Sequence, residues 1–114
     1  MATSLAPTTR ILASRRDGEP VELVSWGSGP GLAVVIGGGT DATSYRAFAE
    51  RMSAHLPVHI HNRRGRGASA DKPADYSTDT EVADLATVLE ETGSGLVAGH
   101  SVGGYFALAA AGLL

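Results

Sequence analysis

A short apolar run at residues 96–98 leads directly into Gly-His-Ser-Val-Gly-Gly at residues 99–104, and residues rich in Tyr, Phe, Leu and Ala follow. The apolar run predicts a buried strand and the later residues predict an apolar helix, so a G-x-S-x-G pattern lies at a strand-to-helix turn. In such a turn the serine has a strained backbone and its hydroxyl projects from the edge of the sheet. The pattern therefore predicts a nucleophile elbow with Ser101 at its tip, a geometry suited to acyl transfer through a covalent ester.

Composition limits the remaining possibilities. The chain has 114 residues, of which 43% are hydrophobic, as is typical of one globular domain. Its net charge of −3 provides no basic field, so we expect neither nucleic acid nor a membrane surface as a partner. The absence of cysteine excludes disulfides and thiolate metal sites. Residues 1–10 lack the apolar core of a secretory signal, and residues 102–114 are too few to cross a bilayer, so a cytoplasmic location is expected.

Four segments before the elbow have patterns typical of β-strands. Residues 10–15 and 21–26 mix apolar and polar side chains on either side of an Asp-Gly step, which predicts a β-hairpin. Residues 32–36 are uninterruptedly apolar, as in a strand covered on both faces. Residues 58–61 alternate in polarity and predict a further strand.

Two helices are expected between these strands and the elbow. Apolar side chains recur at helical spacing within residues 45–56, and Pro57 ends that helix. After a long polar loop at residues 62–77, residues 78–81 resemble a capping box that opens a second helix, which Gly93 closes. The order predicts an α/β fold: a β-hairpin followed by parallel strands, with helices on both faces of the sheet.

With these elements in place, the chain resembles the α/β-hydrolase fold family of serine hydrolases along nearly its whole length. Residues 99–104 match the family's elbow, and residues 62–69 look like its D-x-R-G-x-G-x-S loop, with Asn62 in place of the usual aspartate. Residues 36–39 look like the family's oxyanion loop, although no histidine precedes the glycines. The resemblance implies the fold of that family and a hydrolytic reaction.

The resemblance also implies roles for individual residues. Ser101 would attack an acyl carbonyl, with the N–H of Val102 as one oxyanion donor and the N–H of Gly39 or Gly38 as the second. The expected substrate is a small-molecule ester, thioester, lactone or amide, because the family opens epoxides and removes halides with an aspartate at the serine's position. No cofactor is expected.

The acid and histidine that such hydrolases supply after the serine do not occur in residues 102–114. The resemblance therefore implies that residues 1–114 form the N-terminal part of a domain of roughly twice this length, truncated just after the elbow helix. We expect negligible turnover from these residues alone, because a serine without a base is not activated. A sheet that ends at residues 96–98 leaves an unpaired edge beside an uncovered helix, so self-association is expected.

The histidines are expected to have structural roles. His100 neighbours the serine, but its side chain points elsewhere, which favours packing or specificity tuning over base catalysis. His59 and His61 share one face of a strand, where they could hold a metal. A polar face or loop packing is the better interpretation, because no carboxylates stand in a fixed arrangement nearby.

The basic residues of the long loop allow a second interpretation. Arg63, Arg64 and Arg66 are expected in a solvated loop or in ion pairs with Asp71, Asp75 or acids of a helix. An anion-binding role is the alternative, and it leads to a different class of protein.

In that class, Gly37–Gly39 with the three residues that follow fit G-x-G-x-x-A, and Arg63 and Arg64 would bind the 2′-phosphate of NADP. Two features argue against an NADP-binding module. Such a fold normally opens with the strand that precedes its glycines, whereas about thirty residues come first here, and the elbow would be left unexplained. A third possibility is a non-catalytic protein that keeps the hydrolase fold without its chemistry.

Overall fold

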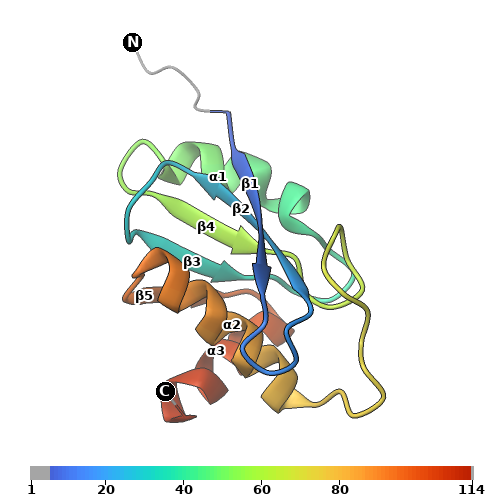
Figure 1. Cartoon of the computed structure of the whole chain (residues 1–114). Helices are drawn as coiled ribbons and strands as arrows, with labels where there is room; N and C mark the ends of the chain where they lie inside the picture. Colours follow the sequence, from blue (N-terminus) through green and yellow to red (C-terminus); the bar gives the residue numbers. More distant parts are fainter. Residues whose placement is uncertain (1–5, 114) are drawn as a thin grey trace.

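The structure is a computed structural model that describes residues 6–113, and it contains one five-stranded sheet with helices on both faces (Figure 1). The strands are β1 (Thr8–Ala13), β2 (Pro20–Trp26), β3 (Leu32–Val35), β4 (Val58–His61) and β5 (Leu96–Gly99). The helical elements are the 3-10 turn η1 (Ala42–Tyr45) and the helices α1 (Arg46–Met52), α2 (Thr78–Thr92) and α3 (Val102–Leu113). None of the described helices has the length and apolar character needed to cross a membrane.

The sheet has the order β1-β2-β4-β3-β5. Strands β1 and β2 form an antiparallel hairpin, and β2 also runs antiparallel to β4. Strand β3 is parallel to both β4 and β5, so the carboxyl ends of these three strands meet at one edge of the sheet. The predicted hairpin followed by parallel strands is confirmed, and the topology brings the glycine loop after β3 next to the elbow after β5.

The side chains of β3 divide the core into two layers. Val34 and the following Ile36 pack with Ala49 of α1 on one face of the sheet. Val35 packs on the other face, with side chains of α2 and α3 that include Phe106. This alternation is what a strand covered on both faces requires. The predicted helices on both faces are therefore confirmed, with α1 on one side and α2 and α3 on the other (Figure 1).

The helix expected over residues 45–56 is shorter than predicted. The structure has η1 first, and α1 then ends at Met52. The N–H groups of Ala54 and His55 donate to the carbonyls of Arg51 and Met52, three residues back, so the chain leaves the α-helical pattern before Pro57. Tyr45 of η1 and Met52 of α1 pack against the same core cluster, so the apolar spacing continued through a 3-10 turn as well as the α-helix.

The N-cap of α2 lies one residue before the predicted capping box. Ser77 is the N-cap, its side chain accepts from the Asp79 N–H, and the reciprocal partner is Thr80. Glu81, the acid expected to reach back, instead accepts from Arg63 and is buried. The predicted end of this helix is confirmed, since Gly93 has the left-handed conformation of a C-cap, with a φ of 74°.

Candidate active site

The predicted turn between β5 and α3 has the backbone geometry of a nucleophile elbow. Strand β5 ends at Gly99, and α3 begins at Val102. Ser101 lies between them with a φ of 58°, and it is the one non-glycine residue with a positive φ among residues 6–113. The left-handed region is strained for a residue with a side chain, and such strain concentrates at functional sites. Ser101 is therefore placed outside the regular helix, with an exposed side chain.

The turn is held from both sides by backbone hydrogen bonds. The N–H of His100 donates to the Val35 carbonyl over 3.0 Å, which extends the pairing of β3 and β5 by one residue. The N–H groups of Gly103 and Gly104 donate to the carbonyls of His100 and Ser101 over 2.9 Å each. These bonds fix the direction in which α3 leaves the sheet and with it the position of Ser101.

The glycine loop after β3 contacts the elbow through Gly37. A β-carbon built on Gly37 would lie 3.3 Å from the Ser101 β-carbon and 3.1 Å from the His100 carbonyl oxygen. The motifs predicted Gly38 or Gly39 of this loop as an oxyanion donor and gave no sign that Gly37 contacts the serine. The two glycines that follow are exposed, and a β-carbon on either would meet nothing within 4 Å.

The backbone N–H groups of Gly38, Gly39 and Val102 are among those in this region that have no acceptor within the described part of the chain. Val102 is the first residue of α3, where N–H groups lack intrahelical partners and the helix dipole favours negative charge. The N–H of Gly37 differs, because it donates to the Tyr45 hydroxyl over 2.9 Å. The site thus offers unpaired donors on both sides of Ser101, from the loop and from the helix.

His100 has a partner other than the serine. Its Nδ1 lies 2.9 Å from the Tyr45 hydroxyl, and the two rings meet edge to face with centroids 5.8 Å apart. The predicted packing role agrees with this contact. Within residues 6–113, no histidine or carboxylate is hydrogen-bonded to the Ser101 hydroxyl.

Residues 30–114 match the sequence model of the alpha/beta hydrolase family, and this range includes both the glycine loop and the elbow. The chain belongs to the alpha/beta hydrolase family. The family that the motifs resembled is therefore confirmed, and so is the expectation that the chain has part of its fold.

Individual relatives of the alpha/beta hydrolase family show how far the similarity extends. The chain is 35% identical over 88 residues to N-formylmaleamate deformylase of Pseudomonas putida, covering 75% of this chain and 33% of that protein. It is 35% identical to an alpha/beta hydrolase from Sphaerobacter thermophilus, with a TM-score of 0.81, covering 90% of this chain and 39% of that one. Epoxide hydrolase A from Mycobacterium thermoresistibile is 25% identical, with a TM-score of 0.82, covering 93% of this chain and 35% of that one. The chain thus spans between 33% and 39% of these hydrolases.

Asn62, the residue that departs from the family's aspartate, ties the loop after β4 to the start of η1 and to β2. Its Oδ1 accepts from the N–H of Ala42, at the start of η1, over 2.7 Å. Its Nδ2 donates to Glu22 over 2.7 Å. A carboxylate at position 62 would face the Glu22 carboxylate without a proton to donate, so the amide is the side chain that fits both neighbours.

Two arginines of this loop, Arg63 and Arg64, form buried ion pairs rather than a solvated patch. Arg63 donates to Glu81 over 2.7 Å, and Arg64 donates to both oxygens of Asp84, at 2.7 and 3.0 Å. Arg64 also reaches Asp17. Burial disfavours the charged form of Arg63, but the Glu81 hydrogen bond and charge leave its pKa raised overall. The predicted pairing with helix acids is confirmed, and the predicted solvated loop is wrong for Arg63 and Arg64, because their side chains are 5% and 1% exposed.

The NADP interpretation is not supported by this arrangement. The guanidinium groups of Arg63 and Arg64 are buried against α2 and occupied by its carboxylates, so they do not face the glycine loop as phosphate ligands. The first helical turn after the glycines is η1, whose N-terminus is capped by the Asp41 side chain. The negative charge of the Asp41 carboxylate at this N-terminus would repel the phosphate of a dinucleotide.

The two histidines of β4 are buried and structural. Nδ1 of His59 lies 2.7 Å from the Ser25 hydroxyl, and its Nε2 lies 2.7 Å from the Gly29 carbonyl oxygen. His61 is 1% exposed, and burial lowers its pKa, while the nearby charges of Glu81 and Asp84 act in the opposite direction. The predicted polar face with loop packing describes His59, whereas the burial of His61 was not foreseen.

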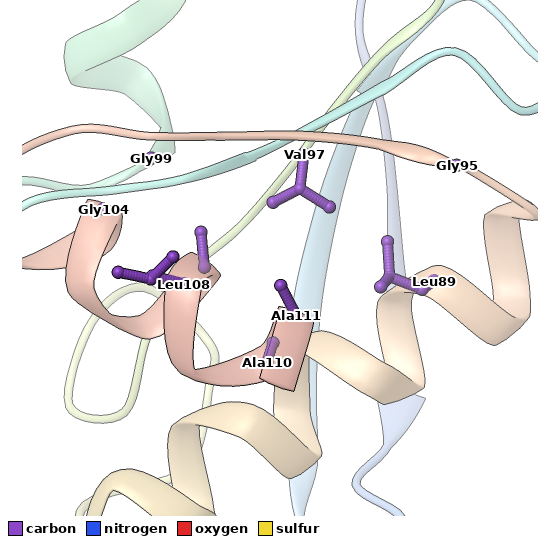
Figure 2. Close-up of a pocket in the computed structure, with 9 residues that line it drawn as sticks. Leu89, Gly95, Val97, Gly99, Gly104, Leu108, Ala110 and Ala111 are labelled. Carbon is purple, nitrogen blue, oxygen red and sulfur yellow. The ribbon is translucent and has the colours of Figure 1, made fainter. Parts of the chain in front are cut away.

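An apolar groove runs along the free side of β5, away from the Tyr45 face of the elbow. Figure 2 shows Val97 pointing from β5 toward α3, with Leu108 and Ala111 on the helix and Leu89 of α2 at the far end. Leu108 is 76% exposed on α3, and Leu96 is 57% exposed at the start of β5. The predicted uncovered helix and unpaired edge of the sheet are therefore present in the described residues.

Proposed function

We propose that Ser101 is the nucleophile of a hydrolase that cleaves small-molecule esters, thioesters, lactones or amides through an acyl-enzyme. The observation that carries the proposal is the left-handed φ of Ser101 at the strand-to-helix turn, with unpaired N–H groups on both sides of it. Strain of this kind persists only where the surrounding structure imposes it, and here it exposes a hydroxyl beside an anion-stabilising helix N-terminus.

The chemistry follows from these positions. The Ser101 oxygen attacks the acyl carbonyl carbon, its proton passes to a base, and the carbonyl oxygen becomes an oxyanion. The N–H of Val102, with that of Gly38 or Gly39, would stabilise the oxyanion. Collapse of the intermediate expels the alcohol, thiol or amine, and water then releases the acid from Ser101. The sequence contains no histidine after Ser101, so the proposal assigns the base to residues outside these 114.

A serine in this position favours acyl transfer over epoxide opening. Attack of a serine on an epoxide would form an ether, which has no carbonyl carbon for water to attack, whereas an acyl-serine is readily hydrolysed. The similarity to an epoxide hydrolase therefore supports the fold, but it does not favour an epoxide as the substrate. The similarity to a deformylase favours a formamide or another small amide as the first substrate to test.

The test is a chimera in which this chain replaces the segment that it matches in the Sphaerobacter thermophilus hydrolase. A panel of small esters, thioesters, formamides and one epoxide is assayed with the chimera and two variants, Ser101→Ala and Ser28→Ala. Ser28 is a matched control, because it is an exposed serine in the loop that precedes β3, at the end of the sheet opposite the elbow. We expect hydrolysis of at least one acyl substrate, lost in Ser101→Ala and kept in Ser28→Ala. Epoxide opening that survives Ser101→Ala would contradict the proposal, and a folded chimera without any turnover would favour the non-catalytic alternative.

A further inference from the structure

One hydroxyl group connects the two backbone segments of the proposed site. The Tyr45 oxygen lies 2.9 Å from the Gly37 nitrogen and 2.9 Å from Nδ1 of His100. Gly37 belongs to the loop after β3, and His100 belongs to the elbow after β5. The carbonyl of Gly37 is held as well, since it accepts from the Thr40 hydroxyl over 2.8 Å.

The Tyr45 hydroxyl bridge lies just beyond the last paired residues of β3 and β5. The last residues paired between β3 and β5 are Val35 and Gly99, and one further bond joins the His100 N–H to the Val35 carbonyl. Beyond that point no strand pairing holds the two segments together. The Tyr45 side chain, half-buried between them, makes the next connection.

The proton positions follow from the donor inventory. A backbone N–H only donates, so the Tyr45 oxygen accepts from Gly37 and its own proton remains available. The nearest acceptor for that proton is Nδ1 of His100 at 2.9 Å, whereas the Thr40 oxygen is 3.4 Å away. His100 then has its own ring proton on Nε2 when neutral, and its Nδ1 is an acceptor.

We infer that Tyr45 is a positioning residue for the oxyanion hole, because its hydroxyl bridges Gly37 and His100 and so fixes the distance between the glycine loop and the elbow. Its effect on catalysis rests on the proposed function, whereas the bridge itself does not. The bridge directs the Gly37 N–H to Tyr45 and leaves the N–H groups of Gly38 and Gly39 for an oxyanion. Among the described residues Tyr45 has no hydrogen bond to Ser101 or to the unpaired donors, so it acts through the Gly37 backbone and the His100 side chain.

The test compares Tyr45→Phe with Tyr105→Phe in the 114-residue chain. Both variants lose one phenolic hydroxyl, and Tyr105 is 58% exposed on α3 with no hydrogen bond from its hydroxyl among the described residues. In Tyr45→Phe we expect amide exchange at Gly37 to accelerate about tenfold, as loss of one hydrogen bond predicts. We also expect the ¹⁵N resonances of the His100 ring to shift toward a mixture of tautomers and the Val102 amide resonance to move. In Tyr105→Phe these signals stay at their wild-type values.

A second variant approaches the bridge from its other end. In His100→Ala the Gly37 amide should keep its protection, because its acceptor is still present, while the Val102 amide resonance moves. Unchanged exchange at Gly37 and unchanged tautomers at His100 in Tyr45→Phe would overturn the bridge. If the Tyr45→Phe chain does not fold, the His100→Ala variant decides. Loss of amide protection at Gly37 in His100→Ala would then also overturn the bridge.

The catalytic consequence has a separate readout in the chimera. Tyr45→Phe should lower kcat about tenfold with KM nearly unchanged, because a displaced oxyanion donor affects the transition state more than substrate binding. Equal kcat values for Tyr45→Phe and Tyr105→Phe would overturn the positioning role. An inactive chimera would instead contradict the proposed function, and the exchange and tautomer measurements would still decide whether the bridge exists.

Discussion

Gly103 lies so close to Val35 that a β-carbon at position 103 would be 2.1 Å from the Val35 carbonyl oxygen. This contact joins the first turn of α3 to the end of β3, directly behind Ser101. The second glycine of the G-x-S-x-G pattern is therefore required by the close approach of a helix to a strand. The approach is what brings the tip of the elbow next to the glycine loop.

Gly103→Ala should destabilise the fold by about 1–3 kcal/mol, because the added methyl group must push backbone away from backbone. Gly112, in the same helix, is the matched control, since a β-carbon there would meet nothing within 4 Å. Gly112→Ala should raise the free energy of unfolding by about 0.5–1 kcal/mol through helix propensity. Urea unfolding monitored by circular dichroism gives both values, and equal effects of the two substitutions would contradict the packing described here.

Ser101→Gly should stabilise the chain by about 1 kcal/mol, because glycine adopts a positive φ without the steric cost that serine bears. No hydrogen bond of the Ser101 side chain within the described residues is lost in the exchange. The same substitution at Ser28, whose φ is not positive, should be neutral or destabilising. Thermal unfolding of the two variants measures the difference, and a lower melting temperature for Ser101→Gly than for Ser28→Gly would argue against a strained elbow.

The elements that sequence patterns predicted best are those fixed by local chemistry. The strand at residues 58–61 and the helix stop at Gly93 agree with the structure because strand alternation and the left-handed C-cap are local. The capping residue of α2 was predicted one position late, because Glu81 is engaged by Arg63 from a different part of the chain. A capping-box pattern covers four consecutive residues, so it cannot show that a distant arginine pairs with one of them.

The stability of the fold should decrease as the pH falls below about 6.5, the usual pKa of histidine. Burial lowers the pKa of His61 in the folded chain, with the charge of Arg63 acting in the same direction and those of Glu81 and Asp84 acting against it. The unfolded chain therefore takes up a proton at His61 at a pH where the folded chain does not. The stability is fully present above pH 6.5 and is lost as the pH falls toward the folded pKa.

His61→Gln should remove this part of the pH dependence, which amounts to at most about 1.4 kcal/mol per pH unit for one proton. His55→Gln is the control, because His55 is exposed. The measurement is the free energy of unfolding in urea at several pH values between about 5 and about 7.5. If the two variants keep identical slopes, the titration of another group explains the pH dependence.

We propose that the free side of β5 makes this chain self-associate. Val97 and Leu108 line an apolar groove there, and strand β5 has β3 as its partner in the described sheet. An unpaired edge beside exposed apolar side chains favours pairing with another copy. Val97→Lys and Leu108→Lys should each shift the sedimentation coefficient toward the monomer, because a buried lysine opposes association.

Ile11→Lys provides the matched control for that experiment. Ile11 is 57% exposed on β1, which is the opposite edge of the sheet. It should leave the sedimentation profile unchanged. A monomeric wild-type chain, or equal effects of all three lysine variants, would contradict association through β5.

The candidate site was only partly visible in the sequence. The serine was identified because glycine, serine and glycine at fixed spacing between a strand and a helix specify one backbone geometry. Tyr45 was assigned to the apolar face of a helix, since its spacing fits that face and gives no sign that its hydroxyl reaches His100. The available signal for Arg63 and Arg64 was the pair of acids at positions 81 and 84, three residues apart on one helix, which face the two adjacent arginines.

The central claim is that Ser101 forms a covalent acyl intermediate. The direct measurement is mass spectrometry of the acid-quenched chimera after mixing with a slowly hydrolysed aryl ester. We predict a mass increase equal to one acyl group on the peptide that contains Ser101, and no such increase in Ser101→Ala. An acyl group found on another residue, or ester turnover that persists in Ser101→Ala, would contradict the account.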